Sequence, residues 1–204
     1  MNNDLACAGI VATASDVTFS PDPNTVVTAA VAIAKAGIEA AAEVPSIKRF
    51  VQTSSSSACE THGLVNTPYD ITDESWNLRS VEEAWKPPPY GMDRIYSTYS
   101  ASKVQQEQEI WKFVKERKPK FVVNCVLPDF NSGPVLNVEE QGYPSTVGML
   151  KMVFNGDMSQ TGVLAPQYMV SETQTCKHCP NSAVDRCPGH CATTCCCAAK
   201  SRRN

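Results

Sequence analysis

Residues 48–57, with the sequence KRFVQTSSSS, carry the clearest fold signal in the chain. The first six residues form a short segment with apolar and β-branched side chains, which is typical of a buried strand. Four serines follow directly, so small hydroxyl groups stand at the carboxyl end of that strand. Because open α/β sheets bind their ligands outside the carboxyl ends of the strands, this stretch predicts both a strand and a ligand site.

Two more strands and a helix are predicted around this stretch. Residues 10–14 and 121–127 are apolar and partly β-branched, which suits buried parallel strands. Residues 20–25 offer turn and helix-capping side chains. The alanine-rich stretch after them predicts a helix that reaches Glu43 and stops before Pro45.

A second helix is predicted from Ser97 or Thr98, either of which can cap it, to Lys118. Residues 60–95 show no sustained period and predict a long surface excursion. Strands and helices otherwise alternate with short connections, and this order favours parallel pairing. The expected fold class is therefore α/β, with a partial doubly wound parallel sheet.

Composition and charge exclude several classes of protein. The chain has 204 residues, 42% of them hydrophobic, which is enough for one globular domain with a core. Its formal net charge of −3 supplies no positive field for nucleic acid or an anionic membrane, so neither partner is expected. Lys35 and Glu39 interrupt the longest apolar run, residues 26–42, and no charged leader is visible ahead of it. We therefore expect a soluble cytoplasmic protein.

Tyr99 and Lys103 stand four residues apart at the start of the second predicted helix. On a helix both side chains project from one face, within reach of a common ligand. The spacing alone is weak evidence, because most such pairs are surface neighbours. The pair gains weight from its position between a strand that ends in serines and a second buried strand.

The order of these residues along the chain points to a known family. Thr53 and Ser55 end one strand, Tyr99 and Lys103 open the next helix, and Pro128 follows the last strand. This arrangement resembles the extended short-chain dehydrogenase/reductase family, and most closely its fungal aldehyde-reductase and plant dihydroflavonol-reductase-like branch. The resemblance covers residues 9–170 and includes ASDVTF at 14–19, VPSIKRFV at 44–51, DESWN at 73–77 and the glycine-proline pair at 133–134.

The resemblance implies an NAD(P)H-dependent oxidoreductase that reduces an aldehyde or ketone of a small organic molecule. Tyr99 would deliver the proton to the carbonyl oxygen, and Lys103 would lower the pKa of that phenol and hold the nicotinamide ribose. Ser55 would donate to the same carbonyl oxygen, with Ser57 as the second choice. Ser54 and Ser56 are interpreted as an ordinary polar exit from the strand. NADP(H) is expected rather than NAD(H), with cofactor contacts implied at Tyr99, Lys103, Ala14, Ser15, Thr53 and Pro128.

The sequence also departs from the family pattern. None of the ten glycines forms the G-x-G-x-x-G turn that binds the cofactor pyrophosphate, so roughly the first third of the nucleotide fold is expected to be absent. The remaining sheet would then have an exposed edge. The residues that select the substrate are expected within 134–170 and beyond.

The composition changes near Val170, because seven of the ten cysteines follow it. We expect a reductase domain over residues 1–170 and a disordered cysteine-rich tail over residues 171–204. No metal is expected in that tail, because a cysteine triplet at 195–197 gives poor geometry for one defined site.

A metal-binding tail is the alternative to this interpretation. Cys176 and Cys179 have the spacing of zinc ligands, and Cys187, His190 and Cys191 could complete a tetrahedron. A catalytically inert truncated product is the other alternative to an active enzyme.

Overall fold

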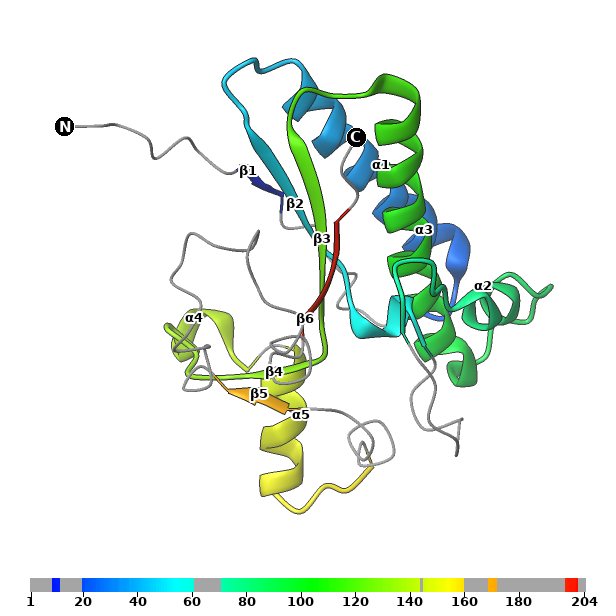
Figure 1. Ribbon diagram of the computed structural model, residues 1–204. Helices are drawn as coiled ribbons and strands as arrows, with labels where there is room; N and C mark the ends of the chain where they lie inside the picture. Colours follow the sequence, from blue (N-terminus) through cyan, green and yellow to red (C-terminus); the bar gives the residue numbers. More distant parts are fainter. Residues whose placement is uncertain are drawn as a thin grey trace. The chain divides into compact units, whose positions relative to one another are not determined.

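The computed structural model describes residues 20–60, 71–143 and 145–159 in full, and only the backbone of residues 9–11, 169–171 and 197–201 (Figure 1). The chain divides into two compact units. The first comprises residues 1–61, 68–127 and 199–204, and the second comprises residues 62–67 and 128–198.

The first unit is built on a sheet with the strand order β1-β2-β3-β6. The strands are β1 (Gly9–Val11), β2 (Arg49–Thr53), β3 (Val122–Pro128) and β6 (Cys197–Ser201). β1 pairs with β2 in parallel, and β2 pairs with β3 in parallel with Phe50 opposite Val123. The predicted α/β class with a partial parallel sheet is confirmed.

Helix α1 (Pro23–Ala42) begins inside the segment that was predicted to be its turn and cap, and it ends one residue before the predicted Glu43, which is its C-cap. Asp22 is its N-cap and accepts a hydrogen bond from the Asn24 amide at 2.9 Å, while Pro23 occupies the first turn, where its missing N–H costs nothing. By length and composition α1 could span a membrane, the one helix among the described residues that could, although it places Ile38 in the core described below.

Helix α3 (Ile95–Arg117) begins earlier than predicted. Ser97 and Thr98 lie inside its first turn, so the expectation that either residue caps the helix is wrong. Thr98 is fully buried, and its hydroxyl donates to the Pro21 carbonyl at 3.1 Å. A hydroxyl residue near a helix start has two possible uses, and here a tertiary hydrogen bond takes the place of a cap.

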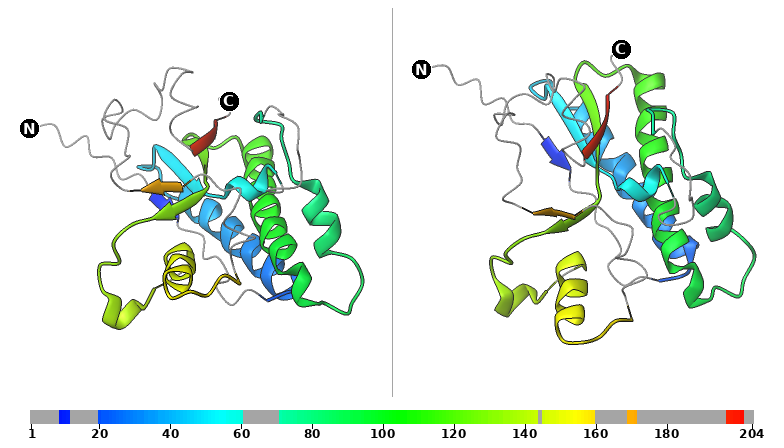
Figure 2. Two further views of the ribbon diagram at one scale, coloured as in Figure 1. Left: turned by 90° about the horizontal axis from the view of Figure 1, so that it is seen from below. Right: turned by 60° about the horizontal axis from the view of Figure 1, so that its bottom comes forward.

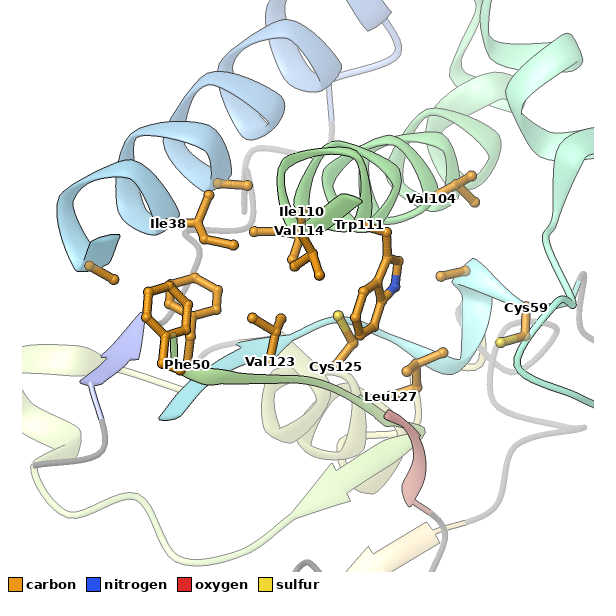
Figure 3. Packing of buried hydrophobic residues seen from close by; sticks show 14 residues of the cluster. Ile38, Phe50, Cys59, Val104, Ile110, Trp111, Val114, Val123, Cys125 and Leu127 are labelled. Atoms are coloured by element: carbon orange, nitrogen blue, oxygen red, sulfur yellow. The ribbon is translucent and has the colours of Figure 1, made fainter. Parts of the chain in front are cut away.

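The core lies between the sheet and the two long helices (Figure 3). Alternate strand residues share one face, so Phe50 on β2 and Val123, Cys125 and Leu127 on β3 all point toward the helices. α1 and α3 pack side by side over that face (Figure 2). The buried helix residues of this cluster include Ala34, Ile38, Val104, Ile110, Trp111 and Val114.

The expectation of an unstructured excursion over residues 60–95 is wrong for part of that segment. It contains helix α2 (Leu78–Ala84) and the short 3₁₀ turn η2 (Met92–Arg94), and a second 3₁₀ turn, η1 (Ser56–Ala58), precedes it. Seven residues are too few to show a helical period, so no sequence pattern predicted α2. A capping side chain, Asn77, and packing against α3 specify it instead.

The second unit contains a two-stranded parallel sheet of β4 (Phe130–Ser132) and β5 (Met169–Ser171), with helices α4 (Val138–Gln141) and α5 (Ser145–Phe154). α5 lies against β4, and the Thr146 hydroxyl donates to the Asn131 carbonyl. The predicted tail contributes β6, whereas residues 172–196 lie outside the described part of the chain. The disorder of the cysteine-rich tail and the domain boundary near Val170 stay predictions.

Candidate active site

The serines after β2 leave the sheet in a defined order. The Ser54 amide bonds the Val126 carbonyl at 2.7 Å and so extends the β2–β3 pairing by one residue. Ser55 then caps η1, and its Oγ accepts hydrogen bonds from the Ser57 amide at 3.3 Å and from the Ser57 hydroxyl at 3.0 Å. Because Ser55 Oγ accepts from Ser57, its own hydrogen is free to be donated elsewhere.

Tyr99 receives that hydrogen bond. The Ser55 side chain is hydrogen-bonded to the Tyr99 phenol, and this bond works against the rise that burial causes in the phenol pKa. Burial is the larger effect, so the Tyr99 pKa lies above its ordinary value. The lowering of this pKa by Lys103 stays a prediction, because the causes of the shift are burial and the Ser55 hydrogen bond.

Lys103 lies one helical turn after Tyr99, and its Nζ is 5.7 Å from the centroid of the Tyr99 ring. The residue is only 3% exposed, and this burial lowers its pKa to about 8. Among the described residues no anion offsets this shift. A buried ammonium group requires hydrogen-bond acceptors, and the hydroxyls of a ribose would supply them. The site therefore fits the nicotinamide half of the expected cofactor.

The structure brings Ser57, Ser55, Tyr99 and Lys103 into one connected group. Thr53, predicted to contact the cofactor, is the exposed last residue of β2. Pro128 is the last residue of β3 and is half-buried. Two further predicted contacts, Ala14 and Ser15, lie outside the described residues.

Sequence reasoning missed Asn77, which holds the loop behind Ser55. Its Nδ2 donates to the Ser57 carbonyl at 2.9 Å and to the Glu60 carbonyl at 2.8 Å, and its Oδ1 accepts from the Ser80 amide at 3.1 Å. Asn77 ends the segment DESWN, which carries part of the family resemblance, and that segment was the available signal.

Sequence reasoning also assigned Ser54 to an ordinary polar exit from the strand. The structure shows that Ser54 is 4% exposed and donates to the carboxylate of Glu107, a fully buried residue of α3. No spacing rule connects these two residues, so no sequence signal announced the contact. Within the described residues no three His, Cys, Asp or Glu side chains gather as a metal site. The residues of the alternative zinc site, Cys176, Cys179, Cys187, His190 and Cys191, lie outside the described residues, so the absence of a metal stays a prediction.

The chain is similar to several known proteins. Over 156 residues the chain is 41% identical to the NAD-dependent epimerase/dehydratase terH of Aspergillus terreus, a match that covers 76% of this chain and 45% of that protein. It is 39% identical over 166 residues to aldehyde reductase 2 of Sporidiobolus salmonicolor, covering 80% and 48%. The ketoreductase nvfG of Aspergillus novofumigatus is 30% identical over 148 residues, covering 71% and 43%. The chain thus spans less than half the length of these relatives.

A solved reductase structure supports the fold. It superposes with a TM-score of 0.53 at 23% identity over 73% of this chain and 43% of the other. No protein-family model matches the chain. The fold defines the class as a Rossmann-type α/β protein. The chain belongs to the extended short-chain dehydrogenase/reductase family, the superfamily of NAD-dependent epimerases and dehydratases, in a branch with fungal members.

Proposed function

We propose that this chain carries the catalytic group of an NAD(P)H-dependent reductase that converts an aldehyde or ketone of a small organic molecule to an alcohol. The observation that carries this proposal is the hydrogen-bonded series from Ser57 through Ser55 to Tyr99, with the buried Lys103 ammonium beside the phenol. The names of the relatives, an aldehyde reductase and a ketoreductase among them, support the same class of reaction.

The hydroxyl groups of Tyr99 and Ser55 have different roles at the carbonyl oxygen. The nicotinamide, when bound, supplies the hydride to the carbonyl carbon. The Tyr99 phenol gives its proton to the carbonyl oxygen, which becomes the alcohol hydroxyl. Ser55, whose hydrogen the Tyr99 phenol accepts in the free protein, donates that hydrogen to the same carbonyl oxygen when the substrate is bound, while its own oxygen keeps the hydrogen bond from Ser57.

Lys103 acts as a cation at neutral pH, because its pKa of about 8 lies above that range. Its charge stabilises the phenolate that Tyr99 becomes after proton transfer, and its hydrogens bind the ribose hydroxyls of the cofactor. Thr53, Pro128, Ala14 and Ser15 complete the cofactor contacts in this proposal, with NADP(H) as the preferred cofactor. A small carbonyl compound is the substrate, nucleic acid and membranes are not partners, and the protein works in the cytoplasm.

The test is a hybrid enzyme, because the chain spans less than half of its relatives. This chain replaces the matching segment of aldehyde reductase 2 from Sporidiobolus salmonicolor, so that Ser55, Tyr99 and Lys103 come from this protein. Oxidation of NADPH and NADH is followed at 340 nm against a panel of aldehydes and ketones. We expect turnover, with NADPH preferred. A folded hybrid that binds NADPH and reduces no member of the panel would contradict the proposal and favour an inert chain.

A further inference from the structure

Glu107 is a buried carboxylate that the proposed reaction does not use. It lies on α3, one helical turn beyond Lys103, and its exposed fraction is 0%. One carboxylate oxygen, Oε2, accepts from the Ser54 hydroxyl at 2.9 Å. The other, Oε1, accepts from the Trp111 indole N–H at 3.3 Å. Burying a carboxylate carries a large desolvation cost, so an apolar residue would serve packing alone better.

The position of Ser54 shows what the carboxylate does. Ser54 is the residue at which β2 leaves the sheet, and it is fixed twice, by its amide on the Val126 carbonyl and by its hydroxyl on Glu107. Ser55 follows it directly, so the two α-carbons are about 3.8 Å apart. Fixing the backbone and side chain of Ser54 therefore fixes the point from which the Ser55 side chain starts.

The same helix carries the other half of the site. Tyr99, Lys103 and Glu107 follow one another at intervals of four residues and share one stripe of α3. The Ser54–Glu107 hydrogen bond thus ties the strand end that bears Ser55 to the helix that bears Tyr99. We propose that Glu107 is a positioning residue, which acts through Ser54 to hold the Ser55 hydroxyl on the Tyr99 phenol. The effect of Glu107 on catalysis rests on the proposed function, whereas the Ser54–Glu107 hydrogen bond does not depend on it.

The experiment measures the Tyr99 phenol in this chain, without cofactor or turnover. Tyrosine labelled with ¹³C at Cζ is titrated by NMR, and the Tyr99 signal is assigned with Tyr99→Phe. Ser54→Ala and Glu107→Met each remove the link, and Ser55→Ala sets the full size of the effect. Trp111→Phe is the matched control, because it removes the other hydrogen bond of the same carboxylate and leaves Ser54 intact.

We expect Ser54→Ala and Glu107→Met to raise the Tyr99 pKa by about 0.5 to 1 unit, since a hydrogen bond contributes on the order of 1 kcal/mol and one pKa unit corresponds to about 1.4 kcal/mol. The double variant should show no larger rise than either single one, and Trp111→Phe should leave the pKa unchanged. Removing the negative charge of Glu107 would by itself lower the Tyr99 pKa, so a rise reports the hydrogen bond and not the charge. Circular dichroism confirms that each variant is folded, and the Cζ chemical shift at neutral pH gives the same comparison for any variant that unfolds in alkali.

Two results would overturn the inference in different ways. If Ser55→Ala raises the Tyr99 pKa while Ser54→Ala and Glu107→Met leave it unchanged, Glu107 is only a structural residue and the proposed function stands. If Ser55→Ala also leaves the Tyr99 pKa unchanged, the parent chain has no Ser55–Tyr99 hydrogen bond, and the proposed function, which rests on that bond, fails as well.

Discussion

The Ser55 side chain at the end of β2 is hydrogen-bonded to the Tyr99 phenol on α3. This hydrogen bond connects the carboxyl end of β2 to helix α3, two elements that the sequence predicted separately. Two effects on the Tyr99 pKa oppose each other, because burial raises it and the Ser55 hydrogen bond lowers it. The phenol keeps its proton at neutral pH, as a general acid must before it can donate.

Tyr99→Phe should remove most carbonyl reduction in the Sporidiobolus hybrid while NADPH binding remains. General-acid transfer typically contributes about 10²–10⁴-fold, so the loss of kcat should fall in that range. Ser55→Ala should also lower kcat, and Ser57→Ala should lower it much less, since Ser57 only orients Ser55. Steady-state kinetics check the three variants. Equal kcat for Tyr99→Phe and the parent hybrid would end the assignment of Tyr99 as proton donor.

Lys103 should make the stability of this chain depend on pH. Its pKa is about 8 in the folded chain, against 10.5 for an ordinary lysine in the unfolded chain, so between these limits the unfolded chain binds more protons. The free energy of unfolding therefore rises with pH, by roughly 2 kcal/mol between about pH 7 and about pH 9.5. Above about pH 10 the raised pKa of Tyr99 acts in the opposite direction, because the unfolded tyrosine loses its proton first.

Urea unfolding of the parent chain and of Lys103→Met across that pH range measures this effect. The variant should lack the rise, and the difference between the two curves cancels the titration of every other group. Curves that stay parallel from about pH 7 to about pH 9.5 would show that Lys103 is not desolvated in the folded chain.

Asn77→Ala should destabilise the chain strongly for a single polar residue. It removes a buried hydrogen bond to the Ser57 carbonyl, a partly buried one to the Glu60 carbonyl and the N-cap of α2, together about 2–4 kcal/mol. Asn137→Ala is the matched control, because Asn137 caps the short helix α4 with one exposed hydrogen bond. Urea unfolding should show a loss below about 1 kcal/mol for this control. Similar losses in both variants would mean that Asn77 does no more than cap a helix.

The 204-residue chain alone should bind nicotinamide dinucleotides poorly. It has no glycine-rich turn for the pyrophosphate, and Lys103 alone cannot replace several charge-assisted contacts of about 1.5–3 kcal/mol each. Isothermal calorimetry with NADPH and NADH on monodisperse, folded protein should give a dissociation constant near the millimolar range or weaker. A low micromolar constant would show that other residues of this chain bind the adenosine half.

Residues 171–204 should hold no stoichiometric metal, because their clustered cysteines do not define a single tetrahedral site. Elemental analysis of protein purified under reducing conditions measures the metal content. One zinc per chain that is lost when Cys176 and Cys179 are changed to serine would establish the zinc site instead.

The sequence by itself determined the elements whose signals are local. Short β-branched runs predicted β2 and β3, and the alanine-rich stretch with turn residues ahead of it predicted α1, because side-chain period and capping depend on neighbours within a few residues. The i, i+4 spacing of Tyr99 and Lys103 placed both on one helix face for the same reason.

Tertiary structure alone decided how these elements use their side chains. Thr98 bonds Pro21 instead of capping α3, and Ser54 bonds Glu107 although it looked like part of a plain polar exit. Local sequence permits several hydrogen-bond partners for a serine or threonine, and their energies differ little. The hydrogen-bond partner is the distant group that the packed core brings within reach of the hydroxyl. A buried polar atom without a partner costs more free energy than the difference between the possible local partners.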